Sequence, residues 1–231
     1  MSEHSLKRPH QRRLRDIWRS SGWPCHDAIE LELLAAGLLQ RQFDERGLET
    51  LRVTDAGLQA LAGTLSRNRA AFDAHEALVA RVATEMQRAG RLVWRGLNLR
   101  APLPDEAGGT RWAMARPDVF SVRITTVEDY LEPVAHEIKV RRADLLSDLR
   151  HPAKAQAYLA MASQCWYVLA DGIAEADEIP PEYGVMQAGA AGLQVIRPAP
   201  KRAMRLPFAA WMALARAHAE PPLDDEAQAG L

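Results

Sequence analysis

Residues 134–140, VAHEIKV, are the stretch of this chain that decides its fold. Their side chains alternate with a period of two, which is typical of a β-strand with two different faces. His136 and Ile138 point to one side of such a strand. Glu137 and Lys139 share the other side, roughly 6–7 Å apart along the strand. The pattern therefore predicts a strand that carries an acid and a lysine on one face.

A second β-rich run, 119–124 (VFSVRI), begins directly after Asp118. A turn over 125–133 would let this run pair with 134–140 as an antiparallel hairpin. The start of one strand then lies near the end of the other, so Asp118 approaches Glu137 and Lys139. Two carboxylates and an ammonium in a strand-rich core are costly unless a cation or a substrate requires them. We therefore expect a divalent metal held by the carboxylates, with the lysine beside it, acting on a phosphodiester.

The string Pro117-Asp118 … Glu137-Ile138-Lys139 resembles the motif of the PD-(D/E)xK nuclease superfamily, over about residues 70–200. The resemblance implies that Asp118 and Glu137 ligate Mg²⁺ or Mn²⁺ and that the Ile138 carbonyl completes the metal shell. It also implies that Lys139 positions or helps to activate the water. The runs 137–148 and 164–169 are similar to the branch that includes the MmcB-like DNA-repair proteins.

The fold that the resemblance implies is α/β, with a mixed central sheet flanked by helices and a restriction-endonuclease-like αβββαβ core. Related nucleases often place a glutamate from the preceding helix at the metal, and Glu76 is the matching residue. They also place polar or basic residues from the following helix at the site. The residues of this helix that match are Lys154, which is preferred, and Gln156. Candidate contacts to substrate phosphates are Arg141, Arg142 and Arg150, because a guanidinium suits bidentate phosphate binding.

Ordinary structural roles remain open for each of these residues. Glu137 and Lys139 could form a salt bridge on a solvent-facing strand, which contributes little to stability. Glu76 could be an exposed helix acid, and the basic residues could be ordinary surface charge. His136 is expected to pack on the opposite face, and His151 to act in a loop or cap. Aromatic residues expected in the core, in preference to a role in base stacking, are Trp112, Trp166 and Tyr167.

The N-terminal part predicts a separate small module. A basic amphipathic helix over 7–19 carries six basic side chains against one acid, and a second helix covers 26–36. A hairpin of 38–43 and 49–53 follows, with Thr54 as the N-cap of a helix over 55–65. This order of elements resembles a winged helix over residues 8–64.

The rest of the chain predicts the elements of the second domain. A long helix is expected over 66–89, a first strand over 92–99, and a Pro- and Gly-rich loop over 102–109. Later elements are helices over 143–149, 152–163 and 207–220 and strands over 164–170 and 193–196. The predicted domains are 1–65 (winged-helix-like), 66–220 (nuclease-like) and 221–231 (a disordered acidic tail).

Composition narrows the class of protein. The 231 residues carry a formal net charge of −1, so any DNA-binding surface must be local. Cys25 and Cys165 form neither a disulfide framework nor a zinc pattern, and they fit a reducing cytoplasm. No apolar run is long enough to span a bilayer, and the basic N-terminus lacks the apolar stretch of a secretory signal.

The sequence thus predicts a Mg²⁺- or Mn²⁺-dependent DNA nuclease, or a repair or restriction-type factor, in the cytoplasm. Hydrolysis would be direct attack by water, without a covalent intermediate. DNA is the expected partner, no membrane is expected, and a homodimer is left open. The first alternative is a catalytically inactive nuclease-fold protein that binds DNA or regulates. The second is a module that only binds other proteins.

Overall fold

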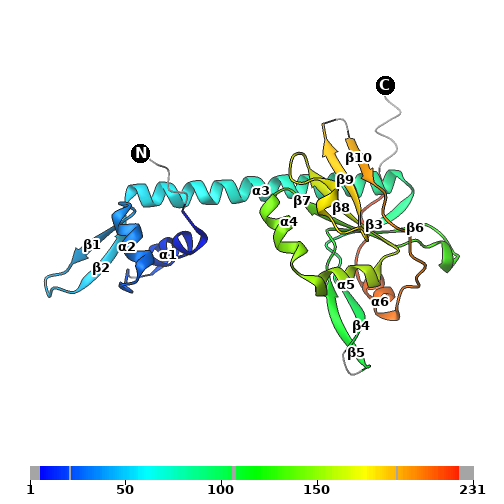
Figure 1. Ribbon diagram of the computed structural model, residues 1–231, viewed down its shortest axis with the longest axis horizontal. Coiled ribbons are helices and arrows are strands. Elements are labelled where there is room, and N and C mark those ends of the chain that lie inside the picture. Colours follow the sequence, from blue (N-terminus) through cyan, green and yellow to red (C-terminus); the bar gives the residue numbers. More distant parts are fainter. Residues whose placement is uncertain (1–5, 21, 106–107, 191, 224–231) are drawn as a thin grey trace. The chain divides into compact units, whose positions relative to one another are not determined.

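The computed structural model describes residues 6–20, 22–105, 108–190 and 192–223 (Figure 1). The chain divides into two compact units, Met1–Phe72 and Asp73–Leu231. The sequence analysis placed this boundary at 65/66. Each unit has its own hydrophobic core, and we describe the two units separately.

The N-terminal unit contains helix, helix, hairpin and helix in that order, as predicted. Helix α1 (Arg8–Arg19) and helix α2 (Ala28–Ala35) precede the antiparallel strands β1 (Leu39–Phe43) and β2 (Glu49–Val53). The Thr54 hydroxyl accepts a hydrogen bond from the Gly57 N–H at 3.1 Å, which is the expected N-cap contact. The apolar faces of these elements meet in one core, made of Leu14, Ile17, Leu33, Leu39, Leu51, Val53 and Leu61.

Helix α3 (Asp55–Arg88) runs without interruption through the point where the sequence analysis expected one helix to end and another to begin. That expectation was wrong because the sequence around Ser66 favours a continuous helix. The residues on both sides of Ser66 are mostly good helix formers, and no proline interrupts them. Gly90, with φ of +72°, follows the end of the helix.

The second unit is built on a six-stranded mixed sheet with the strand order β10-β9-β8-β7-β6-β3. Strands β7, β8 and β9 are parallel, and the other neighbours are antiparallel. The predicted α/β class with a mixed central sheet is confirmed. The strands are β3 (Arg91–Arg95), β6 (Val119–Arg123), β7 (Val134–Lys139), β8 (Gln164–Ala170), β9 (Gly184–Gly189) and β10 (Gly192–Arg197).

Helices cover both faces of this sheet. The C-terminal part of α3 packs Leu78, Val79 and Val82 against Ile138 and Val168 of the strands. Residues of α4 (Arg142–Leu149), α5 (Pro152–Met161) and α6 (Phe208–Arg216) join the core on the other face. All six residues of β7 are buried as a result, including His136, whose predicted packing role is confirmed.

A second hairpin, β4 (Leu99–Pro104) with β5 (Thr110–Ala115), occupies a stretch for which the sequence analysis expected the end of a strand and a loop. Strand β3 ends at Arg95, and Gly96 turns the chain with φ of +60°. Prolines were taken as loop signals there, but both lie in β4, which pairs on one side only within its two-stranded sheet. Trp112 on β5 is half exposed, so its predicted place in the core was wrong, whereas Trp166 and Tyr167 are buried as expected.

The residues after α6 contact the second unit up to Pro221, the first residue of the predicted tail. Helix α6 ends at Arg216, and the Glu220 N–H donates to the Val93 carbonyl at 2.7 Å. The Gln87 side chain donates to the Pro221 carbonyl. The rest of the predicted tail, 224–231, lies outside the described residues. Two short 3-10 helices, η1 (Glu128–Tyr130) and η2 (Ala176–Glu178), complete the fold. Within the described ranges, every helix is too short or too polar to cross a membrane.

Candidate active site

The predicted hairpin brings Asp118 to the end of β7. Strand β6 pairs antiparallel with β7, with Val119 opposite His136. Asp118 directly precedes β6, and its Oδ2 accepts a hydrogen bond from the Ile138 N–H at 2.7 Å. The expected approach of Asp118 to the Glu137–Lys139 segment is therefore confirmed.

Glu137 and Lys139 form a buried pair on one face of β7. The Lys139 Nζ donates to Glu137 Oε1 at 2.6 Å, and the two side chains are 11% and 9% exposed, respectively. Glu137 Oε2 is also buried and makes no hydrogen bond to the described residues. The pair is thus not on a solvent-facing strand, and burial makes an unpaired carboxylate oxygen costly.

Two further charged residues join this pair from α4 and α5. The Lys154 Nζ donates to Glu137 Oε1 at 2.6 Å and to Asp148 Oδ1 at 2.5 Å. Lys139 Nζ lies 3.3 Å from Asp148 Oδ2, which also accepts the Tyr167 hydroxyl at 3.0 Å. We call the five charged residues the carboxylate–lysine cluster: Asp118, Glu137, Lys139, Asp148 and Lys154.

The cluster has one more acid than base. Three carboxylates and two ammonium groups sum to a formal charge of −1. Burial and the neighbouring Glu137 carboxylate raise the pKa of Asp118. Burial acts in the same direction on Asp148, but Lys139 and Lys154 outweigh it and lower the pKa of that carboxyl. A further positive charge near Asp118 and Glu137 would relieve the repulsion between them.

Tyr158 closes one side of the cluster. Its hydroxyl donates to the Arg116 carbonyl at 2.7 Å, and the Lys154 Nζ lies 5.3 Å from the centre of its ring. Burial and the nearby Glu137 raise the pKa of Tyr158, so the hydroxyl stays protonated. The tyrosine therefore holds the position of Lys154 as well as that of the chain segment before Asp118.

Glu76 does not contact Asp118 or Glu137 directly. Its Oε1 lies 3.2 Å from His75 Nδ1, and His75 Nε2 lies 3.4 Å from Asp118 Oδ2. The sequence analysis missed His75, although it directly precedes Glu76 on α3. His75 thus stands between Glu76 and Asp118.

The predicted phosphate-binding residues divide into two groups. Lys154 lies within the cluster, and Arg150 lines a hollow of about 530 Å³ with Asp148 and Lys154. Arg142 instead forms a two-pronged ion pair with Glu178, at 3.0 and 2.6 Å, and Gln156 accepts a hydrogen bond from Arg111. Arg141 is partly buried at the start of α4. The structure therefore brings Lys154 and Arg150 to this region and engages Arg142 and Gln156 elsewhere.

Asp148 and Tyr167 were not predicted for the site. Asp148 falls within the run 137–148 that carries the family resemblance, but it lies near the end of α4, and no motif residue marks that position. Tyr167 is opposite Glu137 in the parallel pairing of β7 with β8. That register, once known, would have identified it.

Asp118 and Glu137 fit the metal that the resemblance implies. Their carboxylate oxygens are hard ligands, and Mg²⁺ is commonly held by one or two carboxylates together with waters. Glu137 Oε2, buried without a hydrogen-bond partner in the described part of the chain, is suited to such a cation. Among the described residues, no group of three or more His, Cys, Asp and Glu side chains is arranged around a common metal position. A site here would thus depend on two carboxylates.

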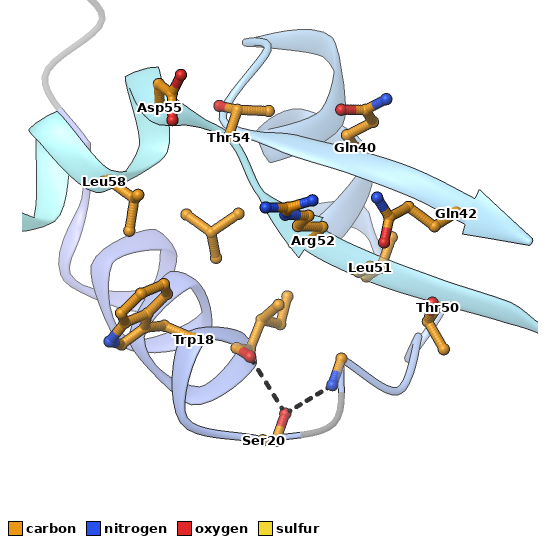
Figure 2. A pocket seen from close by; sticks show the side chains of 13 residues that line it. Trp18, Ser20, Gln40, Gln42, Thr50, Leu51, Arg52, Thr54, Asp55 and Leu58 are labelled. Atoms are coloured by element: carbon orange, nitrogen blue, oxygen red, sulfur yellow. Dashed lines mark hydrogen bonds between the residues drawn. The ribbon is translucent and has the colours of Figure 1, made fainter.

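The N-terminal unit contains a larger hollow, which we call the hairpin groove (Figure 2). It measures about 710 Å³ and lies between the end of α1, the β1–β2 hairpin and the start of α3. Gln40, Gln42 and Arg52 reach from the hairpin, and the Trp18 ring lies beside Leu58. Only Arg52 and Asp55 of its lining residues are charged.

Comparisons with known proteins identify no function. No family model matches the chain, and the search of curated proteins returned no match. Among solved structures, it is similar to a protein of unknown function from Silicibacter pomeroyi, at 22% identity and a TM-score of 0.41. The match covers 59% of this chain and 77% of that one.

Proposed function

We propose that the second unit is a divalent-cation-dependent nuclease of the PD-(D/E)xK type that hydrolyses DNA phosphodiesters. One observation carries the proposal. Asp118, just before β6, lies beside Glu137 on β7, Lys139 pairs with Glu137, and one Glu137 oxygen has no hydrogen bond within the described part of the chain. Burying a charge costs on the order of several kcal/mol for each ion. A purely structural role does not require such a cost.

Asp118 and Glu137, together with the Ile138 carbonyl, would hold Mg²⁺ or Mn²⁺. When bound, the cation would polarise the phosphate and lower the pKa of water. Lys139 is held by Glu137 and Asp148, so its ammonium keeps one position and can donate to the attacking water or to a phosphate oxygen. Direct attack by water requires no nucleophile from the protein.

Lys154 is the cation that a substrate can reach more easily. Its side chain is 34% exposed, compared with 11% for Lys139. Its burial alone would lower its pKa, but Glu137 and Asp148 outweigh that effect and raise it, so the ammonium stays charged. Lys154 and the neighbouring Arg150 can therefore neutralise a phosphate at the open side of the cluster.

A cleavage assay tests the proposal. Purified protein is incubated with supercoiled, linear and branched DNA in Mg²⁺, Mn²⁺ or EDTA. Metal-dependent cleavage by the wild type, lost in Asp118→Asn and Glu137→Gln, is the expected result. Asp177→Asn, at an exposed acid of η2 away from the cluster, is the matched control and should cleave normally. Equal cleavage by the wild type and Asp118→Asn would contradict the proposal.

A second candidate is a nuclease-fold protein that binds DNA or regulates without cleaving. The observation in its favour is that Lys139 and Lys154 already pair with Glu137 and Asp148. Salt-dependent DNA binding that survives Glu137→Ala, with no cleavage in either metal, would favour this candidate.

DNA as the partner and a reducing compartment are part of the same proposal. Cys25 and Cys165 are both free thiols, which agrees with a cytoplasmic location. Size-exclusion chromatography with light scattering would decide between a monomer and the homodimer that the sequence analysis left open.

A further inference from the structure

The outer face of the β4–β5 hairpin carries exposed side chains that the core does not require. The register places Arg100 opposite Met114 and Pro102 opposite Trp112, and these two pairs share one face. Trp112 is 51% exposed and Met114 is 60% exposed. The other face is buried in the core of the unit through Leu99, Ala101 and Leu103.

The hairpin is also positively charged outside its turn. Arg100, Arg111 and Arg116 are exposed, and none of them forms an ion pair with an acid of the described residues. The Arg100 guanidinium lies 5.1 Å from the centre of the Trp112 ring, which fixes the ring and still leaves half of the side chain accessible. Both acids of the segment, Asp105 and Glu106, belong to the stretch between the two strands.

This face continues toward the carboxylate–lysine cluster. Trp112, Met114 and Arg116 alternate along β5 and its extension, and Asp118 follows after Pro117. Trp112 and Asp118 are six positions apart, so at most roughly 20 Å of chain joins them. The Arg116 carbonyl accepts the Tyr158 hydroxyl, and Tyr158 packs against Lys154. A bound chain that follows this row would therefore arrive at the candidate active site.

We propose that the outer face of the β4–β5 hairpin binds single-stranded DNA that leads into this site. A base would stack on Trp112, and Arg100 and Arg116 would pair with phosphates. Stacking on an aromatic side chain requires a base that is free of its neighbours, which an intact duplex does not offer. The inference deepens the proposed function, because it names the strand state of the substrate that the cluster would cleave.

Binding in EDTA tests this inference without any cleavage. Fluorescence anisotropy compares a labelled oligothymidylate with a duplex of equal length. Trp112→Ala should weaken single-strand binding about tenfold, whereas Trp112→Phe should keep most of the affinity. Arg100→Ala should weaken it less and reduce its dependence on salt. Trp211→Ala, which removes a partly exposed tryptophan from α6, is the matched control and should bind normally.

Two results would overturn the inference. One is equal single-strand affinity of the wild type, Trp112→Ala and Arg100→Ala. The other is an equal loss of duplex and single-strand affinity in Trp112→Ala. Circular dichroism melts show that the variants are folded. Loss of binding in Trp112→Ala with no cleavage by the wild type supports this inference and contradicts the nuclease, whereas cleavage with unchanged Trp112→Ala binding does the reverse.

Discussion

The carboxylate–lysine cluster and the hairpin groove differ mainly in buried charge, and this difference makes the cluster the better candidate for chemistry. The groove measures about 710 Å³ and includes only two charged residues among those that line it. The cluster brings five charged side chains together on one face of the central strand β7, and Glu137, Lys139 and Asp148 expose 11% or less of their side chains. Uncharged Gln and Thr side chains at an open surface lower the stability of the fold little, whereas each buried ion lowers it by on the order of several kcal/mol.

The largest difference between the two regions should appear in cleavage. Asp118→Asn and Glu137→Gln keep the shape of each side chain and remove a negative charge. We expect cleavage to fall by about 10²-fold or more, because the preorganised charge around the phosphate is lost. The measurement is the initial rate of plasmid nicking in Mg²⁺.

Asp118→Asn should lose activity without losing stability. Burial and Glu137 raise the pKa of Asp118, so its charged form is disfavoured in the folded protein. An uncharged amide removes this repulsion, and the free energy of unfolding in urea should stay equal or rise. A clear loss of stability in this variant would show that Asp118 has a structural role.

Breaking the cluster from the lysine side should reduce stability. Lys139→Met leaves Glu137 and Asp148 with Lys154 as their remaining partner. We expect the free energy of unfolding in urea to fall by about 3 kcal/mol, the low end for breaking a buried pair. Lys201→Met removes an exposed pair with Glu132 and is the control, with a loss within about 1 kcal/mol. Similar losses in both variants would mean that the cluster is solvated.

Stability should depend on pH through His136, which lies on the face of β7 opposite to Glu137. Burial lowers the pKa of His136 to about 3, and neither ring nitrogen has a hydrogen-bond partner among the described side chains. The unfolded chain takes up a proton below about pH 6.5, whereas the folded protein does not, so stability is present above that pH and lost as the pH falls toward 3. This histidine alone should cost about 2 kcal/mol at pH 5 relative to neutral pH.

His136→Leu isolates that contribution. The variant should lose less stability than the wild type between pH 7 and pH 5, measured by urea unfolding at each pH. Parallel pH profiles for the two proteins would show that His136 does not titrate differently on unfolding.

The groove should give the smallest effects. Trp18 and Arg52 are exposed, so Trp18→Ala and Arg52→Ala should change stability by no more than about 0.5 kcal/mol. Their single-turnover cleavage rates at saturating protein should stay within about twofold of the wild type, since neither residue belongs to the cluster's unit. A rate loss comparable to that of Asp118→Asn would place chemistry in the N-terminal unit and break the comparison.

The central hairpin and its three charged residues could be predicted because the information is local. Period-two alternation sets the face of each side chain in 134–140, and one turn brings Asp118 back to that strand. The N-terminal order of elements followed from similar local signals, including the Thr54 cap.

The rest depended on packing between distant elements. Asp148 and Tyr167 join the cluster from a helix and from a parallel strand pairing, whose register no local pattern determines. Strand β9 is short and begins and ends with glycine, so it carried no clear signal. The prolines of β4 indicated a loop, although they are compatible with a strand in a two-stranded hairpin. The wrong prediction that Trp112 lies in the core followed from that same error.

The central claim is that Asp118 and Glu137 together hold a divalent cation. Titration of the protein with Mn²⁺, followed by the electron paramagnetic resonance signal of the free ion, tests it without DNA. The account predicts one saturable site in the wild type that is lost or strongly weakened in both Asp118→Asn and Glu137→Gln and kept in Asp177→Asn. Identical Mn²⁺ binding by the wild type and both cluster variants would contradict it.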